Sequence, residues 1–524
     1  MSTHPPGTAR RGRDRKAEVL MPVPGRDRFG RGDAPSVAVV GGGIAGLAAA
    51  TGLAERGARV TLYEREESLG GRLAGHRTRL ADGSEATMSR GFHAFFRQYY
   101  NLRGLLRRTD PGLDRLTPLP DYPLRHSGGL TDSFARVPRT PPLSALGFVA
   151  LSPTFGWRDL TAMDARAALP LLDVRVPEVY ARFDEVGATA FLERVRFPEA
   201  AHHLAFEVFS RSFFADPREL SAAELMLMFH IYFLGSAEGL LFDVPDEPFP
   251  QALWEPLGDY LRRLGADLRT GTPVEAVEPA VGGGAEVRTG TGAGGDRYDA
   301  VVLALDTGGL RRVVGASPQL GTGPWRDDIA ALRTAPPFLV SRFWLDRPVR
   351  ADRPGFLGTG GYGRLDNISV LERYEGEAAR WAGKNGGSVV ELHAYAVADG
   401  AGRQQVQEEL LGQLRQVYPE TRLARVVDAR HEWRADCPLF RVGTHRRRPT
   451  VRTPHPWLTL AGDGIRCDLP VALMERAATT GFLAANALLA GWGVRGQVLW
   501  SVPRAGRSPV LRALNTLAGR PARR

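Results

Sequence analysis

The sequence predicts an α/β fold, in which a Rossmann-like nucleotide-binding domain is interleaved with an α+β domain. Three observations lead to this prediction. A short apolar run, a glycine-rich turn and an alanine-rich helix occupy residues 37–57, and a second strand, turn and helix occupy residues 458–490. Between them, residues 271–306 contain two further apolar strands, and the remaining segments show a mixed, largely helical pattern.

The first unit has the spacing of a dinucleotide site. VAVV predicts a buried parallel strand, and Gly41, Gly43 and Gly46 form GxGxxG at its turn into a helix. The first glycine permits the tight turn, the second lets the backbone approach a pyrophosphate, and the third lets the helix pack on the strand. The helix N-terminus, at Ile44 and Ala45, offers N–H groups to a phosphate.

The next strand supplies an acidic residue at the expected distance. RVTLY predicts a strand that ends at Glu64, eighteen residues after Gly46, where a carboxylate binds the ribose hydroxyls of a nucleotide. The glycine pattern alone is weak evidence, because GTGAGG at residues 290–295 also matches it. The strand YDAVVLAL follows that second copy, which therefore predicts a hairpin loop.

The residues after the acid favour a flavin over a nicotinamide cofactor. REESLGGRL contains Arg65 and the triplet Gly70, Gly71 and Arg72. This stretch resembles the extension found in the superfamily of flavin amine oxidases and carotenoid desaturases. The resemblance implies that the triplet wraps the pyrophosphate and that the arginine supplies a countercharge.

The C-terminal unit supports the same assignment. LTLAGDG and the helix that follows resemble the C-terminal flavin element of that superfamily, which implies that Gly462, Asp463 and Met474 contact the cofactor. Asp463 matches the acid that meets the ribityl or pyrophosphate portion. The helix, expected to start near Val471, directs its N-terminal dipole at the flavin pyrimidine edge, where negative charge gathers on reduction. We therefore expect FAD and a fold of the amine-oxidase type.

A third segment completes the predicted domains. In GTPVEAVEP, Val274 is expected to face the adenine. No second well-placed dinucleotide motif exists, which suggests oxygen, a quinone or a carrier protein as the electron acceptor. The predicted FAD-binding domain comprises residues 35–100, 260–315 and 455–494, and the predicted substrate domain comprises residues 101–259 and 316–454.

The segment RGFHAFFRQYYNLRGLLRR, residues 90–108, resembles the GLHxFFxxYxN segment of phytoene and ζ-carotene desaturases. Together with HEWRADCPLF and GDGIRCDLPVALMERA, it is most similar to the β-carotene desaturase/methyltransferase family, the φ-ring or isorenieratene synthases. The resemblance covers residues 36 to 490. It implies an FAD-dependent enzyme that aromatises the β-rings of β-carotene to φ-rings by hydride abstraction and an intramolecular 1,2-methyl shift.

Two positions depart from the desaturase pattern. The acid that usually stands two residues before the glycine of GLH is Ser89 here, and Arg476 interrupts the usual MEGA. We expect the first change to remove a charge near the flavin and the second to add a cation there, which disfavours linear desaturation. A linear carotene desaturase or a redox-neutral carotene isomerase stays open as the alternative. A flavin amine oxidase would instead line its pocket with acidic or amide groups, and a non-catalytic carotenoid carrier would hold flavin that substrate never reduces.

Aromatic side chains are candidates for the reaction. Aromatisation removes four hydrogens from each ring, so two two-electron oxidations are needed, and aromatic faces attract the cation that hydride loss creates. The candidates are Phe95, Phe96, Tyr99, Tyr100, Phe229 and Tyr232. Core packing explains each of them as well, and Phe96 and Tyr99 are preferred.

Histidines offer one candidate base. His93 is expected to accept the final proton, although a structural role explains it equally. His202, His203 and Glu207 have metal-like spacing but lack further ligands, so no metal site is predicted.

The net charge of +10 is concentrated at the two ends of the chain. Residues 1–34 carry eight Lys or Arg and four acids, and residues 495–524 carry seven Arg and no acid. We expect residues 1–34 to be a disordered basic tail without an export signal, and residues 495–524 to be a basic amphipathic tail. The helix expected at residues 508–520 suits a membrane surface or docks on the body. The basic ends lack a nucleic-acid reading motif, so we expect no nucleic-acid partner. Without an export signal and with an amphipathic tail, we expect a cytoplasmic enzyme on the inner face of the cell membrane.

Overall fold

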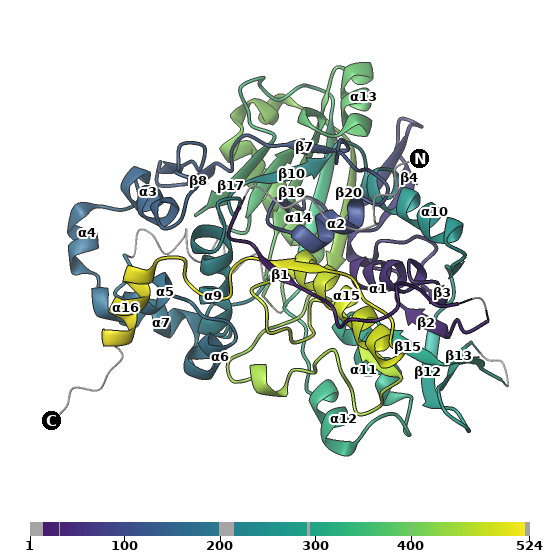
Figure 1. Ribbon diagram of the computed structural model, residues 1–524. Helices are drawn as coiled ribbons and strands as arrows, with labels where there is room; N and C mark the ends of the chain where they lie inside the picture. Colours follow the sequence, from purple (N-terminus) through teal and green to yellow (C-terminus); the bar gives the residue numbers. More distant parts are fainter. Residues whose placement is uncertain (1–13, 31, 199–213, 291–293, 399, 519–524) are drawn as a thin grey trace, which may run out of the picture.

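A five-stranded parallel sheet lies at the centre of the nucleotide-binding half of the molecule (Figure 1). The computed structural model describes residues 14–30, 32–198, 214–290, 294–398 and 400–518. In spatial order the strands are β11 (Asp267–Arg269), β3 (Arg59–Tyr63), β2 (Ser36–Val40), β15 (Ala300–Leu303) and β21 (Leu458–Leu460). Three separated segments of the chain therefore build one sheet, and the predicted α/β class is confirmed.

The two faces of this sheet are covered by different elements. Val37 and Val39 of β2 pack with α1 (Ile44–Ala54) and α15 (Leu473–Gly491). Ala38 and Val40 pack on a small antiparallel sheet instead. Its strands are β12 (Val274–Pro279), β13 (Ala285–Thr289) and β14 (Asp296–Tyr298). Because β13 and β14 are antiparallel neighbours, the second glycine pattern joins a hairpin as predicted, although residues 291–293 lie outside the described residues.

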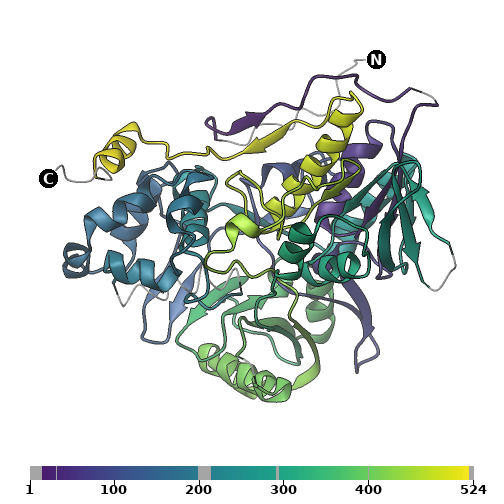
Figure 2. The ribbon, with the colours of Figure 1, turned by 90° about the horizontal axis from the view of Figure 1, so that it is seen from below.

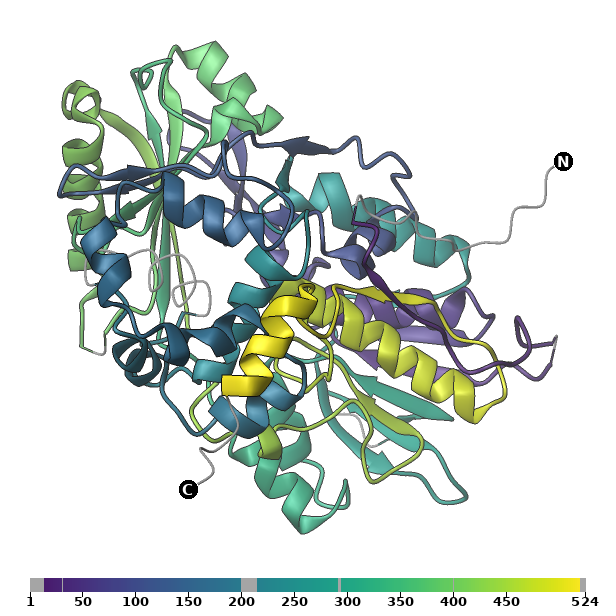
Figure 3. The ribbon, with the colours of Figure 1, turned by 60° about the vertical axis from the view of Figure 1, so that its left-hand side comes forward.

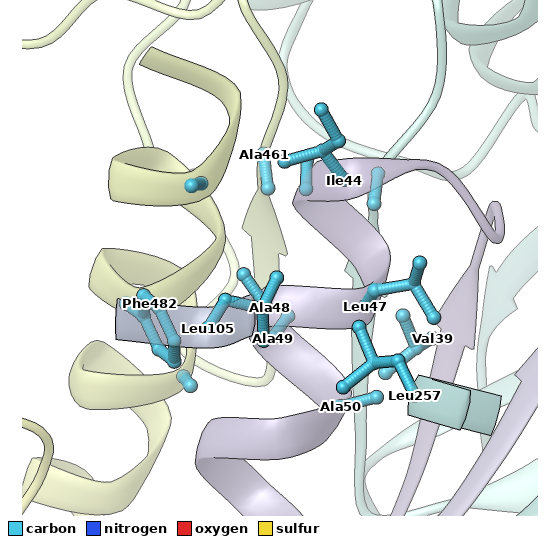
Figure 4. Close-up of a cluster of buried hydrophobic side chains, with 14 of the residues drawn as sticks. Val39, Ile44, Leu47, Ala48, Ala49, Ala50, Leu105, Leu257, Ala461 and Phe482 are labelled. Atoms are coloured by element: carbon cyan, nitrogen blue, oxygen red, sulfur yellow. The ribbon is translucent and has the colours of Figure 1, made fainter. Parts of the chain in front are cut away.

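Helices α1 and α15 approach each other closely because small residues line their contact (Figure 4). A Cβ added to Gly481 would lie 2.2 Å from the carbonyl oxygen of Ala45, so only glycine fits there. Ala48 of α1 and Phe482 of α15 belong to the same buried cluster. Small residues on α15 therefore let it pack closely against the start of α1, next to the glycine-rich turn.

A seven-stranded sheet forms the other half of the molecule (Figures 1 and 3). In spatial order its strands are β20 (Val426–Arg434), β16 (Phe338–Leu345), β19 (Ser388–Ala394), β18 (Asn367–Val370), β17 (Phe356–Gly360), β8 (Leu124–His126) and β9 (Thr131–Asp132). Neighbouring strands are antiparallel except β17 and β8. α14 (Arg403–Val417) buries Val406, Leu410 and Leu414, spaced four residues apart on one helix face, in the cluster that covers this sheet.

Short helices form a lobe beside the seven-stranded sheet, at the left of Figure 1. They are α3 (Leu143–Leu151), α4 (Trp157–Ala162), α5 (Ala165–Leu172), α6 (Glu178–Phe183), α7 (Ala188–Val195) and α9 (Ala222–Phe229). The apolar run at residues 225–234 lies in α9 and in a π-helical segment, His230–Leu234, and is almost wholly buried. In the described ranges, every helix is too short or too polar to cross a bilayer.

The remaining elements connect these layers. They are β4 (Gly75–Arg79), β5 (Glu85–Ser89), β6 (Phe95–Phe96), α2 (Tyr100–Leu106), β7 (Leu116–Pro118), β10 (Phe242–Pro245), α10 (Glu255–Arg263), α11 (Thr307–Gly315), α12 (Gly323–Ala330) and α13 (Gly376–Asn385). β4 and β5 form a hairpin, and β10 pairs with β6 and β7. The segment around residue 93 therefore runs from this hairpin to α2, which packs against α15.

The described segments near the two ends of the chain pair with each other along one side of the molecule (Figure 2). The strands that join them antiparallel are β1 (Glu18–Leu20) and β22 (Leu499–Ser501). Arg507 pairs with Asp14 at 2.6 Å, and Arg504 pairs with Glu18 at 3.0 Å. The described part of residues 1–34 thus departs from the expected disordered tail, because its acids and its strand find partners in the C-terminal segment. Residues 1–13 lie outside the described residues.

The C-terminal segment ends in a helix, α16 (Pro509–Ala518), as predicted for residues 508–520. α16 packs against α5 in the helical lobe (Figure 3). Asn515 lies within hydrogen-bonding distance of Asp173, and Val510 is 67% exposed. One side of α16 therefore meets the body of the protein, and Val510 faces solvent.

Candidate active site

A cavity of about 570 Å³ runs from the carboxyl ends of the parallel strands to the inner face of the seven-stranded sheet. At one end it is lined by the glycine-rich turn and the end of β3, and in its middle by the start of α15. At the other end it is lined by side chains from β6, β10, β17 and the segment around β19. A single cavity therefore joins the nucleotide-binding half to the second sheet.

The glycine-rich turn needs its three glycines for different reasons. A Cβ on Gly41, which has φ +110°, would lie 2.3 Å from the carbonyl oxygen of Ala304, and one on Gly46 would lie 1.8 Å from that of Gly41. A Cβ on Gly43 would approach only the Cα of Gly71, at 3.7 Å. Gly43 lines the cavity, so a side chain there would fill the space that a pyrophosphate requires.

The start of α1 also suits an anion. Leu47 donates the first hydrogen bond of the helix to Gly43, so the N–H groups before it, including those of Ile44 and Ala45, are left for a ligand. Gly43 is the N-cap and has no side chain that could satisfy them. The chemistry of this donor set fits the pyrophosphate of a dinucleotide.

Glu64 lies where the ribose acid was predicted. It is 7% exposed, lines the cavity, and accepts backbone N–H bonds from Gly42 at 2.7 Å and Glu66 at 2.9 Å. These two bonds fix the carboxylate and leave lone pairs for hydroxyl donors. Arg65 lies 3.8 Å from Asp306, and Val274 lines the same end of the cavity.

The GGR triplet and the C-terminal turn meet in the middle of the cavity. The Gly70 N–H donates to the Gly42 carbonyl at 2.9 Å, and Gly71, with φ +57°, lies directly over Gly43. Arg72 pairs with Asp463 at 2.5 Å. Burial lowers the pKa of Arg72, but Asp463 outweighs it and raises the pKa above its usual value. The two charged residues that the resemblance assigned to the cofactor therefore hold each other in place.

The C-terminal turn leads into α15 at the same point. Gly462, with φ +144°, donates its N–H to Thr480 at 2.9 Å, which ties the turn to the helix. α15 begins at Leu473, two residues later than expected, and Met474 in its first turn lines the cavity. Gly462, Asp463 and Met474 thus line the cavity beside the GGR triplet, which the Arg72–Asp463 pair joins to the turn.

His93 lines the cavity as a neutral imidazole. Its Nδ1 lies 2.9 Å from the carbonyl oxygen of Gly91. Because a carbonyl oxygen only accepts, Nδ1 carries the hydrogen and Nε2 keeps its lone pair. Burial lowers the pKa of His93 to about 4, so the ring is uncharged at neutral pH.

Three of the six aromatic candidates line the cavity. The Phe96 ring centroid lies 4.6 Å from that of Tyr232, and the Tyr99 and Tyr232 hydroxyls share a hydrogen bond of 2.9 Å. Burial raises the pKa of Tyr99 well above its usual value, so this hydroxyl stays protonated. The other three, Phe95, Tyr100 and Phe229, do not line the cavity and pack in the core.

Sequence reasoning missed most of the aromatic chamber, which we define as the cavity wall formed by Phe92, Phe96, Tyr99, Tyr122, Tyr232, Phe242, Phe356 and Tyr395. Phe92 stacks on Phe356 at 4.2 Å between centroids, and Tyr122 lies 4.5 Å from the same ring. The chamber rings come from five separate parts of the chain: residues 92–99, Tyr122, residues 232–242, Phe356 and Tyr395. A lone aromatic residue in a strand pattern indicates core packing, so no local signal marks them.

Asn101 of the desaturase-like segment proves to be structural. Its side chain donates to Thr479 at 2.8 Å and to the carbonyl of Trp500 at 2.9 Å. Glu475, also on α15, accepts the backbone N–H groups of Asn101 and Leu102, both at 2.9 Å. Burial raises the pKa of Glu475 to about 8. These bonds attach α2 to α15.

Ser89 lies beside a buried ion pair that two other strands contribute. Glu391 of β19 accepts the Phe92 N–H at 2.9 Å, and Arg342 of β16 pairs with Glu391 at 2.7 Å and donates to Ser89 at 3.1 Å. Burial opposes ionisation of Glu391, but Arg342 and His393 outweigh it and lower its pKa to about 2. An ionised carboxylate, paired with Arg342, therefore lies beside Ser89 and Phe92.

Arg476 does not place its charge in the cavity, which corrects the expectation of an added cation. It pairs with Glu224 of α9 at 3.0 Å, and Glu224 also pairs with Arg448 at 2.7 Å. Burial opposes ionisation of Glu224, but the two arginines lower its pKa to about 2. Arg476 is 3% exposed and absent from the cavity lining, so it offers no argument against linear desaturation.

In the described ranges, His, Cys, Asp and Glu side chains form no cluster of three or more suited to a metal ion. His202, His203 and Glu207 lie outside the described residues.

Comparisons with known proteins show the family and the fold of the chain. The family model of flavin containing amine oxidoreductases matches residues 44–489. A carotenoid phi-ring synthase of Streptomyces griseus is 72% identical over 97% of this chain and 98% of its own length. A carotenoid phi-ring synthase of Chlorobaculum tepidum is 28% identical over 89% of this chain and 90% of its own length. The cyclohexylamine oxidase of Brevibacterium oxydans matches 88% of this chain and 99% of its own at a TM-score of 0.62 and 15% identity, which shows the fold alone.

The family match confirms the two main predictions from the sequence. The fold is the α/β fold of amine oxidases with its interleaved second domain, and the cofactor is FAD. The chain is an FAD-dependent oxidoreductase that belongs to the family of flavin-containing amine oxidoreductases.

Proposed function

We propose that this enzyme aromatises the β-rings of a carotenoid such as β-carotene to φ-rings, acting as a desaturase/methyltransferase. The relative that is 72% identical over nearly the whole chain, itself a carotenoid phi-ring synthase, supports the proposal. The observation that carries it is the aromatic chamber, which adjoins the start of α15 and the Arg72–Asp463 pair within one cavity. A hydrocarbon ring fits the aromatic part of this wall, and polar side chains, among them Asp366, Asn367 and Asp436, line other parts of the same cavity.

The reaction needs four hydrogens removed from each ring. Two leave as hydrides and two as protons, while one methyl of the geminal pair moves to the neighbouring carbon. FAD, when bound, supplies the hydride acceptor. No external methyl donor is required, because the methyl group stays on the ring throughout.

The residues proposed to hold FAD line one end and the middle of the cavity, except Gly46, which packs against Gly41 within the turn. They are Gly41, Gly43, Ile44, Ala45 and Gly46 for the pyrophosphate, Glu64, Arg65 and Val274 for the adenosine, and Gly71, Arg72, Gly462, Asp463 and Met474 for the remainder. Backbone N–H groups and Arg72 neutralise the anionic part, and Glu64 accepts from the ribose hydroxyls.

The chamber residues act on the substrate ring. Faces of Phe96, Tyr99 and Tyr232 stabilise the ring cation that follows hydride loss, each by about 0.5–2 kcal/mol when water is excluded. His93 accepts a proton at Nε2. Although its pKa of about 4 makes it a weak base, a ring cation that becomes aromatic by losing a proton is a far stronger acid.

The runner-up is a linear carotene desaturase or a redox-neutral isomerase. Phytoene and ζ-carotene desaturases of Synechococcus elongatus match about half of this chain at 24% and 27% identity. Purified holoprotein incubated separately with β-carotene and lycopene in lipid vesicles distinguishes them. We expect an aromatic product from β-carotene; reaction of lycopene alone would overturn the proposal.

We also propose that the enzyme works at the surface of an anionic membrane, on the cytoplasmic side, where a quinone or oxygen reoxidises the flavin. Three leucines of α3, Leu143, Leu146 and Leu151, are 56%, 58% and 55% exposed. The first two lie on one helix face, one turn apart, and the exposed Arg136 and Arg139 precede them. Apolar residues beside cations suit the boundary between headgroups and acyl chains.

The position of α3 connects this surface to the chamber. Phe148, on the buried side of α3, stacks on Phe134 at 4.9 Å between centroids, and Phe134 lines the cavity. Ser144 of α3 donates to the carbonyl of Phe233, another lining residue. A lipid-soluble substrate that leaves the bilayer at α3 therefore has a short route to the chamber.

A further inference from the structure

We propose that Glu391, His393 and Tyr395 form a proton relay that takes one of the two ring protons from the substrate. This inference rests on the proposed function. The proposed base His93 accounts for one proton acceptor, but aromatisation releases two protons from each ring. The structure contains a second, independent group of acid–base residues facing the same chamber.

The three residues lie in line because they alternate along one strand. β19 carries Glu391 and His393, and Tyr395 follows its last residue, so the three side chains share one face of the sheet. His393 Nε2 lies 3.0 Å from Glu391 Oε1, and His393 Nδ1 lies 2.6 Å from the Tyr395 hydroxyl. Glu391 and His393 are at most 1% exposed, and His393 and Tyr395 line the cavity.

The surrounding charges set the direction of the hydrogen bonds. Arg342 donates to Glu391 Oε2 from Nε at 3.0 Å and from Nη2 at 2.7 Å, which keeps this carboxylate ionised. An ionised carboxylate only accepts, so His393 Nε2 donates its hydrogen to Glu391. His393 Nδ1 then has a lone pair, and it accepts the hydrogen of Tyr395.

The tyrosine oxygen is prepared to receive a proton. Asn367 Nδ2 donates to it at 3.0 Å, which stabilises negative charge on the oxygen as its own hydrogen leaves. Asn367 is 5% exposed and lines the cavity, and its Oδ1 accepts no hydrogen bond from the described residues. Polar groups beside aromatic walls are costly to bury, which indicates that they face something polar or reactive in the chamber.

The step balances without a further reactant. A ring C–H bond breaks and its electron pair becomes part of the new ring double bond. The proton forms an O–H bond with Tyr395 while the original phenolic proton moves to His393 Nδ1. The resulting imidazolium is paired with Glu391, so the charge that leaves the ring is neutralised inside the protein.

The variant Tyr395→Phe tests the relay, because it removes the hydroxyl and keeps the ring. We measure two rates with β-carotene in vesicles: anaerobic flavin reduction, which reports hydride transfer, and formation of the aromatic product. We expect flavin reduction within about two-fold of wild type and product formation slower by about 100-fold or more. His393→Gln is the second variant and should slow the same step.

Tyr260→Phe is the matched control. Its hydroxyl donates to Glu55 at 2.8 Å, outside the cavity lining, and its removal should change neither rate. The flavin-to-protein absorbance ratio verifies that each variant is folded and loaded. If wild type forms no aromatic product, the proposed function fails. If wild type forms it and Tyr395→Phe matches its rate, or slows flavin reduction equally, the relay is overturned.

Discussion

At the scale of single residues, the partner of each charge decides what that charge does. Arg72 pairs with Asp463, and because both residues line the cavity, a ligand there can contact them. Arg476 is 13 residues further along the chain than Asp463, yet it pairs with Glu224, which neutralises it away from the cavity. The same residue type is therefore proposed to bind the cofactor in one place and connects α15 to α9 in the other.

The variant Arg72→Ala should weaken FAD binding. It removes the guanidinium that neutralises the cofactor and leaves Asp463, whose side chain is 12% exposed, as an unpaired charge beside it. A hydrogen bond to a charged group contributes about 1.5–3 kcal/mol, so we expect the Kd for FAD to rise about 10- to 100-fold. Fluorescence titration of the apoprotein measures it.

The control for this variant is Arg77→Ala. Arg77 is 74% exposed on β4 and lies 3.9 Å from Glu85, which is equally exposed. Surface pairs of this kind contribute little, so the Kd should stay within about two-fold of wild type. Equal affinity in Arg72→Ala and wild type would remove Arg72 from the cofactor site.

The sequence predicted those residues whose role depends on neighbours in the chain. Gly41, Gly43 and Gly46 act together within one turn, and a fixed spacing reveals them. The partner of Arg476, by contrast, is 252 residues away, and the Arg342–Glu391 pair beside Ser89 comes from two other strands. Such roles depend on strand pairing and helix packing, which no local pattern contains.

At the scale of elements, α3 is unusual because it is apolar on both sides. Ala145 and Phe148 face the core, while Leu143, Leu146 and Leu151 face solvent. A helix that is apolar all round is normally buried, so the outer face of α3 indicates an apolar partner. The sequence instead predicts a helix suited to a membrane surface or to docking on the body at residues 508–520, where helical apolar spacing occurs together with arginines.

Replacing Leu143, Leu146 and Leu151 together by Ser should abolish binding to anionic vesicles. Each leucine that enters an apolar phase contributes about 1.5–3 kcal/mol, so losing three should lower the partition coefficient by more than 100-fold. Vesicle flotation measures the partition, and turnover of detergent-solubilised β-carotene should remain near wild type.

The matched control is Leu423→Ser. Leu423 is 75% exposed in the segment before β20, and it stands apart from α3 in the chain. Its replacement should leave flotation unchanged. Full membrane binding by the triple variant would assign attachment to another surface and would remove α3 from the proposal.

At the scale of the whole molecule, the interleaving of the chain makes cofactor binding a property of the entire fold. The proposed FAD wall is drawn from residues 41–72, from Val274 and from residues 462–474. The seven-stranded sheet is built from the segments between them and contributes to the same cavity. Neither half can unfold without disturbing the site, so we expect ligand binding to stabilise both halves together.

Added FAD should therefore raise the Tm of the apoprotein in one cooperative transition, and NAD should not. A ligand at 100 times its Kd stabilises the folded state by about 2.7 kcal/mol, which corresponds to a shift of several degrees. Differential scanning calorimetry gives the number of transitions, and far-ultraviolet circular dichroism follows both sheets. Two transitions of which only one moves would show that the halves unfold independently, and an equal shift with NAD would contradict the choice of flavin that the GGR triplet and the C-terminal turn imply.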